Sequence, residues 1–146
     1  MLLKFRIWYA RAVLAVAALL FAFLAHLYVM TPLDGIDMFG VSLSGEPHSV
    51  TFLRTGLGAM FASLFLTSVV GLIRPRLLLT CLTFVVGVMS LIVAIRVYGL
   101  AVDGVSDKNL SELTTEATCW LVFVTGWLCL PKGGVKVGGA ELSTGN

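Results

Sequence analysis

The chain is poor in the residues that catalysis and metal binding use most. Its 146 residues include three cysteines and two histidines, and only 12% are charged. The cysteines (Cys81, Cys119 and Cys129) form no CxxC pair and have no histidine at a metal-ligand spacing. This pattern favours small, polarizable core residues over a zinc or redox centre. We therefore predict no metal site, no cofactor and no catalytic residues, and we do not expect an enzyme.

Hydrophobic residues take the place of the missing polar ones. They make up 58% of the chain, and the mean hydropathy is +0.99. They form continuous runs without the period-two alternation of a membrane β-barrel. Each run is about 19–26 residues, enough for one helical crossing of a bilayer. The sequence predicts an all-α, four-helix transmembrane bundle with helices at roughly 7–30, 50–73, 77–102 and 112–130.

The breaks between the runs carry helix-terminating residues. Thr31-Pro32, Asp103-Gly104 and Pro131 end the first, third and fourth runs, since proline and glycine do not continue a helix well. The turn at residues 74–76, Arg-Pro-Arg, is tight enough to make the second and third helices antiparallel neighbours. Two regions lie outside the helices. They are a loop at 33–49, with a short strand or interfacial segment at 41–44, and a flexible cytoplasmic tail at 132–146.

The first run has a basic start, as a secretory signal peptide does. Its apolar stretch is longer than that of most signal peptides, and no small-x-small cleavage site lies near residues 24–27. A retained helix is the favoured interpretation, with cleavage as the alternative. Residues 1–131 then form one transmembrane domain.

Charges are sorted between the two ends of the predicted helices. One end has seven basic residues and one acid, and the other has three basic residues and seven acids. The basic set is Lys4, Arg6, Arg11, Arg74, Arg76, Lys132 and Lys136. The positive-inside rule places this end, and both termini, in the cytoplasm. We expect a bacterial inner-membrane protein that contacts anionic lipids and does not bind nucleic acid.

Small residues recur at helical spacing on three of the helices. Ala15, Ala18, Ala22 and Ala25 form one stripe, and similar sets occur near Gly58 and Gly87. Such stripes let two helix backbones approach closely. The helix that packs against such a stripe belongs either to the same bundle, which we favour, or to a second copy of the chain in a homodimer.

Five ionisable residues are predicted at similar depth near the outer end of the bundle. They are Arg54, Arg96, Glu116, Asp103 and His26. A charge inside a span costs about 2.5–3.5 kcal/mol near the centre, so such groups normally face inward and pair. We predict pairs of Arg96 with Glu116 or Asp103, and of Arg54 with Glu116. Asn109 and Glu112 have the spacing of a capping box that starts the fourth helix.

Three interpretations of this cluster are open. The favoured one is a structural clasp at the outer end. The second is a pocket for an anionic, lipid or quinone-like ligand, in which the two arginines bind a carboxylate and His26 changes charge near neutral pH. The third is a proton or ion pathway, for which polar residues toward the other end are sparse.

Two short patterns resemble a known family. They are Phe52-x-Arg54-x-Gly56-x-Gly58 and Arg96-x-x-Gly99 followed by Asp103-Gly104. They resemble a family of small bacterial four-helix membrane proteins known only as a domain of unknown function, itself distantly DoxX-like. The resemblance covers roughly residues 12–130 and implies a bundle with an outer-face arginine pair, but no reaction. Some DoxX-like proteins are linked to thiol or quinone oxidation, but this chain lacks an outward-facing cysteine pair.

These observations favour a non-enzymatic function. We expect an accessory or interaction subunit within the membrane, in a larger membrane complex or a homo-oligomer. The alternative is a small-molecule binding or transport protein that uses the outer Arg/Glu cluster.

Overall fold

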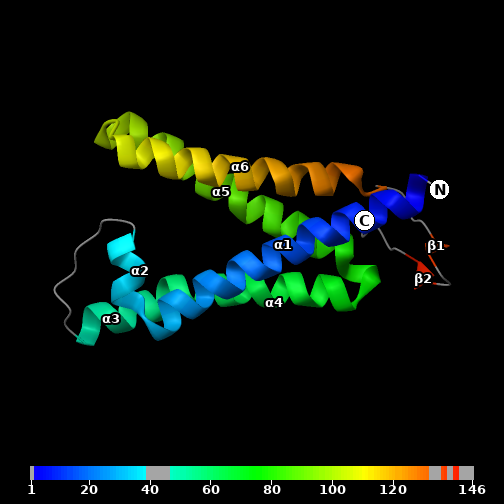
Figure 1. Cartoon of the computed structure of the whole chain (residues 1–146), viewed down its shortest axis with the longest axis horizontal. Coiled ribbons are helices and arrows are strands. Elements are labelled where there is room, and N and C mark those ends of the chain that lie inside the picture. Colours follow the sequence, from blue (N-terminus) through cyan, green and yellow to red (C-terminus); the bar gives the residue numbers. More distant parts are fainter. Residues whose placement is uncertain (1, 39–46, 132–135, 138–139, 142–146) are drawn as a thin grey trace. The chain divides into compact units, whose positions relative to one another are not determined.

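The structure, a computed structural model, describes residues 2–38, 47–131, 136–137 and 140–141. It is helical apart from a short two-stranded ladder near the C-terminus (Figure 1). The elements are α1 (Leu2–Met30), α2 (Pro32–Met38), α3 (Pro47–Leu53), the π-helix η1 (Arg54–Gly58), α4 (Ala59–Ile73), the 3-10 helix η2 (Pro75–Leu77), α5 (Leu78–Asp103), α6 (Asp107–Cys129), β1 (Lys136–Val137) and β2 (Ala140–Glu141).

Three helical stretches are long and apolar enough to cross a membrane, among the residues that the structure describes. They are Leu2–Met30, Pro47–Ile73 and Pro75–Asp103. The predicted fourth span is also a long helix, α6, but it is not one of these candidates. Its first half carries all of its charged residues, including Glu112 and Glu116. Length and composition thus support an all-helical fold with three candidate spans.

Most helix boundaries lie at the helix-terminating residues that interrupt the apolar runs of the sequence. α1 ends at Met30, and α2 begins at Pro32, where proline suits the first turn of a new helix. α5 ends at Asp103 because Gly104 takes φ +97°, in the region that favours glycine. α2 occupies part of the predicted 33–49 loop, and the predicted strand at 41–44 lies outside the described residues.

The start of α6 corrects one prediction. Ser106 is the N-cap residue, and its hydroxyl accepts a hydrogen bond from the Asn109 amide at 3.2 Å. The predicted capping box of Asn109 and Glu112 is therefore wrong, because the helix begins at Asp107 and Asn109 already lies within its first turn. Glu112 is left available for contacts with another helix.

The chain divides into two compact units. The first takes in residues 1–14 and 70–146, and the second is Ala15–Val69. α1 and α4 contribute residues to both units. The sequence did not predict this division within residues 1–131.

In the first unit, α5 and α6 form a hairpin and lie side by side (Figure 1). The buried residues of α5 follow a helical spacing of three, one, three and four, so they lie on one face: Leu78, Cys81, Leu82, Val85 and Met89. Gly126 of α6 lies where α1 approaches, because a Cβ there would be 2.8 Å from a Val13 methyl. Gly126 thus permits close helix contact, although the sequence analysis did not name it. Gly87, which it did name, has no described atom within 4 Å of an added Cβ.

The turn between α4 and α5 is as short as predicted. Only Arg74 separates α4 from η2, and the Leu77 amide donates to the Arg74 carbonyl at 2.9 Å. Gly71, at the end of α4, lies so close to Cys81 that a Cβ there would be 2.8 Å from the Cys81 Cβ. Pairing of the two helices beyond this point stays a prediction, since most of α4 belongs to the second unit.

The second unit has its own aromatic and aliphatic core. Tyr28, Ile36 and Leu53 are buried together. The Tyr28 and Phe61 rings stack with their centroids 5.5 Å apart. Gly58 lies against α1, because a Cβ there would be 2.9 Å from a Val29 methyl. This core connects the end of α1 to α2, α3 and η1.

The tail has one described feature. β1 and β2 pair antiparallel, with Lys136 opposite Glu141 and Val137 opposite Ala140. The sequence analysis expected no such ladder in the tail. The rest of residues 132–146 lies outside the described residues.

Candidate functional site

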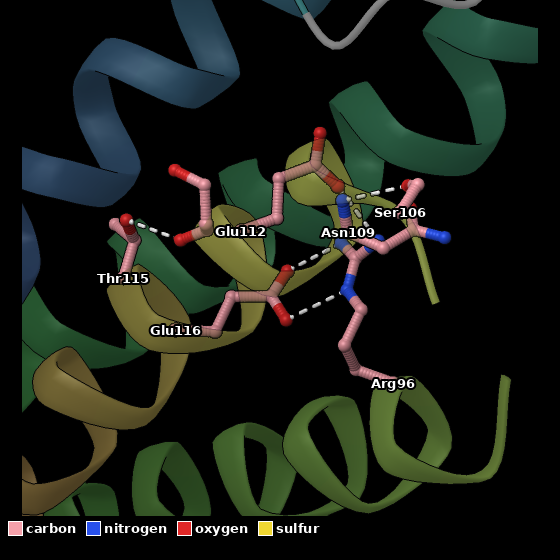
Figure 2. Close-up of polar contacts among 7 residues, drawn as sticks. Arg96, Ser106, Asn109, Glu112, Thr115 and Glu116 are labelled. Carbon is pink, nitrogen blue, oxygen red and sulfur yellow. Dashed lines mark hydrogen bonds and ion pairs between the residues drawn. The ribbon is translucent and has the colours of Figure 1, made fainter. Parts of the chain in front are cut away.

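Arg96 of α5 is the centre of an ion-pair network with α6 (Figure 2). Its Nε and Nη2 atoms donate to the two carboxylate oxygens of Glu116, at 3.0 and 2.6 Å. Its Nη1 atom lies 2.7 Å from a carboxylate oxygen of Glu112. The predicted pairing of Arg96 with Glu116 is therefore present, with Glu112 as a second partner. We call Arg96, Glu112 and Glu116 the Arg96 clasp.

The clasp follows from helix periodicity. Glu112 and Glu116 are four residues apart, so both side chains extend from the same face of α6. Arg96 projects from α5 between them, as Figure 2 shows. The side chains of Arg96, Glu112 and Glu116 are 29%, 16% and 22% exposed. Partial burial makes each hydrogen bond stronger than it would be in water.

All three guanidinium nitrogens of Arg96 are occupied by carboxylates. A fork-to-fork pair with Glu116 uses two of them, which is the strongest arrangement that arginine makes with a carboxylate. The clasp carries two negative charges against one positive charge. An incoming anion would therefore have to displace a glutamate and would meet excess negative charge.

A cavity of about 320 Å³ lies beside the clasp in the first unit. It is lined by α5 residues between Ile92 and Asp103, and by Asn109 of α6. Asp103 thus shares this cavity with Arg96 but takes no part in the ion pairs of the clasp, among the residues that the structure describes. The cavity wall combines apolar side chains with the Asp103 carboxylate and with Arg96, whose nitrogens are already paired with glutamates.

The other two predicted site residues lie in the second unit. His26 is an exposed residue of α1, and Arg54 is the exposed first residue of η1. In this π-helix the Ala59 amide donates to the Arg54 carbonyl five residues earlier. Such π-turns occur often at functional positions. The predicted pairing of Arg54 with Glu116 stays a prediction.

Two further polar contacts join α5 and α6. The indole N–H of Trp120 donates to Ser90 Oγ at 2.8 Å, and that of Trp127 donates to Thr83 Oγ1 at 2.9 Å. Each hydroxyl in turn donates to its own helix, Ser90 to the Val86 carbonyl and Thr83 to that of Leu79. Together with the Arg96 clasp, these two hydrogen bonds give three side-chain contacts spaced along the α5–α6 hairpin. We call the series the α5–α6 ladder and each contact one rung.

The sequence reasoning missed both tryptophan rungs. The signal that would have found them is a shared spacing of seven residues. Thr83 and Ser90 lie two helical turns apart on α5, and Trp120 and Trp127 do so on α6. Two polar residues on one helix can meet two indoles on another only if both pairs keep the same spacing and face.

No group of three or more His, Cys, Asp or Glu side chains suited to a metal ion occurs among the described residues. Cys81, Cys119 and Cys129 are free thiols. Buried side-chain nitrogen and oxygen atoms in the described part of the chain all have a hydrogen-bond partner. The buried polar side chains of the described residues are therefore satisfied within the protein.

No protein-family model, curated protein or solved structure matches this chain. The resemblance to DoxX-like membrane proteins therefore stays a prediction that rests on the Arg54 and Arg96 patterns.

Proposed function

We propose that this protein is a multi-pass membrane protein of four crossings that acts without catalysis, as an accessory or interaction subunit within a bacterial inner membrane. The observation that carries the proposal is the double pairing of Arg96 with Glu112 and Glu116. The strongest charged groups of the candidate site are used to hold two helices together. The apolar helix surfaces are then the main means of contact with other molecules.

The ladder between α5 and α6 supports a fourth crossing. α5 is one of the three apolar stretches long enough to span a membrane. The rungs connect α6 to α5 near both ends and in the middle, at residues 96, 90 and 83 of α5. A helix that is paired along the length of a spanning helix has to lie at the same depth. The charged start of α6 is tolerated because its glutamates pair with Arg96 instead of lipid.

The charge sorting of the sequence supports the orientation. An even number of crossings puts both termini on one side, and the basic residues favour the cytoplasm. The acidic α5–α6 turn would then lie outside. The tail beyond α6 would lie inside.

The alternative function, binding or transport of a small anionic, lipid or quinone-like molecule, gains little from the geometry. Arg96 has its nitrogens occupied, and Asp103 adds a carboxylate to the neighbouring cavity. Of the two predicted arginines, only Arg54 has no carboxylate partner among the described residues.

The test is purification of the tagged full-length chain from its own membrane in a mild detergent, followed by native mass spectrometry. The interaction role predicts a defined stoichiometric assembly with a second polypeptide or a second copy. The matched control is the same preparation of the chain produced alone in a foreign host, where only a homo-oligomer can form. A monomer that carries a small molecule, lost on Arg54→Gln substitution, would contradict the interaction role and favour the alternative.

A further inference from the structure

The end of the first unit opposite the clasp is held by two arginines that donate to backbone carbonyls. Arg6 Nε donates to the Cys129 carbonyl at 2.7 Å, and Arg11 Nη2 donates to the Leu72 carbonyl at 3.1 Å. Cys129 and Leu72 lie in the last turns of α6 and α4, where carbonyls have no partner within the helix. A cation there also interacts favourably with the helix dipole. These bonds bring the start of α1 to the ends of two other helices.

The same contacts gather three more cations at this end. Lys4 precedes Arg6 by two residues, and Arg74 and Arg76 follow Leu72 within four residues. All three side chains are exposed. We call Lys4, Arg6, Arg11, Arg74 and Arg76 the basic end.

The basic end has no carboxylate to neutralise it within the described helices of its unit. The acids of these helices all lie between Asp103 and Glu116, at the far end of the α5–α6 hairpin. α5 alone has 26 residues, which separates the two ends by about 39 Å at 1.5 Å per residue. Attraction between charges that far apart is screened at physiological salt. The described helices of this unit therefore supply no counter-charge to the basic end, and an anion from another molecule can supply it.

Exposed apolar side chains lie directly beside these cations. The Trp8 and Phe5 side chains are each 70% exposed, and that of Ile73 is 72% exposed. The Arg11 guanidinium lies 5.7 Å from the centre of the Trp8 ring. Exposed tryptophan next to arginine and lysine, at the end of apolar helices, is typical of the layer where lipid headgroups meet acyl chains. The surface thus offers charge to a phosphate and apolar contact to an acyl chain.

We propose that the basic end is a binding site for an anionic phospholipid, with Lys4, Arg74 and Arg76 contacting its phosphate and headgroup. Arg6 and Arg11 position these three by fixing α1 against α4 and α6. The inference rests on the proposed membrane location but not on the accessory role. A lipid site of this kind would persist whether the protein acts alone or in an assembly.

The test measures lipid binding to the full-length chain in a mild non-ionic detergent by native mass spectrometry. The probes are phosphatidylglycerol and phosphatidylcholine with identical acyl chains. We expect the protein to prefer phosphatidylglycerol, and Arg74→Gln to reduce that preference about fivefold, because each basic residue near a charged lipid surface contributes about 1 kcal/mol. The triple variant K4Q/R74Q/R76Q should lose the preference altogether. Lys108→Gln is the matched control, since it removes one positive charge at the other end of the hairpin.

Three results would overturn the proposal. One is an unchanged preference in the triple variant. Another is a loss of the phosphatidylglycerol preference in Lys108→Gln as large as that in Arg74→Gln, which would show that only the net charge of the protein matters. The third is displacement of the lipid by the same concentration of inorganic phosphate, which would identify a site for free phosphate. The conservative variant R74K/R76K separates lipid binding from folding, because it keeps both charges and should keep the preference.

Discussion

The geometry of the Arg96 clasp predicts how much stability is lost when one or more of its three charges are removed. Glu116→Gln removes the fork-to-fork pair but leaves Arg96 with Glu112 as a partner. We expect a loss of about 1.5–3 kcal/mol of stability, the usual contribution of a hydrogen bond to a charged group. Arg96→Met leaves two glutamates facing each other without a cation. We expect that loss to be larger, about 3–4 kcal/mol, because it resembles the breaking of a buried pair.

The size of these stability losses depends on how far the three side chains of the clasp are buried. The three side chains are 16–29% exposed, so most of their surface is withdrawn from solvent. An isolated charge there costs several kcal/mol, whereas a neutral side chain of similar shape costs little. The triple variant R96M/E112Q/E116Q should therefore be within about 1–2 kcal/mol of the natural chain. It should also be more stable than R96M alone.

The assay is thermal unfolding of the purified variants in one mild detergent. The predicted order of stability is natural chain, then the triple variant and Glu116→Gln, and last Arg96→Met and the double variant E112Q/E116Q. If the losses of the single substitutions simply add up in the triple variant, the three groups are solvated separately, and the account of the clasp is wrong.

Three further predictions use the same unfolding assay. Gly126→Ala should destabilise the protein because its Cβ would be 2.8 Å from a Val13 methyl, whereas Gly87→Ala should be neutral or stabilising by up to about 1 kcal/mol because no described atom lies within 4 Å. Equal effects of the two would refute the close packing at Gly126. Trp120→Phe should cost about 0.5–1.5 kcal/mol through its lost indole hydrogen bond, and no loss would mean that this rung contributes nothing. Gly104→Ala should cost about 1–3 kcal/mol because φ is +97° there, and a neutral result would show that the turn relaxes freely.

Much of the helical pattern was predictable because it depends on local sequence. Pro32, the Arg-Pro-Arg turn at 74–76 and Gly104 interrupt apolar runs, and the helices break at these places. The pairing of Arg96 with Glu116 was predictable for a different reason. Both lie at similar distances from the ends of adjacent helices, and an unpaired charge inside an apolar helix is costly.

Other features depend on contacts that no local pattern reveals. α6 begins at Asp107 because Ser106 caps it, whereas the sequence also offered Asn109 as a cap. Because Ser106 is the cap, Glu112 does not serve a capping box at Asn109, and it pairs with Arg96 instead. The function assigned to Arg6 and Arg11 also changes. Their charge indicated orientation, but their carbonyl partners at Cys129 and Leu72 lie more than 60 residues away in the chain.

The sequence grouped the five candidate site residues by their expected depth along the helices, and the structure brings part of this group together. Arg96 and Asp103 share a cavity in the first unit, whereas Arg54 and His26 belong to the second. Depth along a helix can be estimated by counting residues. The division of a chain into compact units depends on how whole helices pack, which residue counting does not give.

We propose that α6 crosses the membrane beside α5, so that the chain crosses four times with both ends inside. The most direct measurement is labelling of single cysteines in intact cells with a membrane-impermeant maleimide, after Cys81, Cys119 and Cys129 have been replaced by alanine. The account predicts that Val105→Cys in the α5–α6 turn is labelled at once. It also predicts that Ser143→Cys in the tail is labelled only after the cells are permeabilised. Labelling of the tail in intact cells would contradict the account.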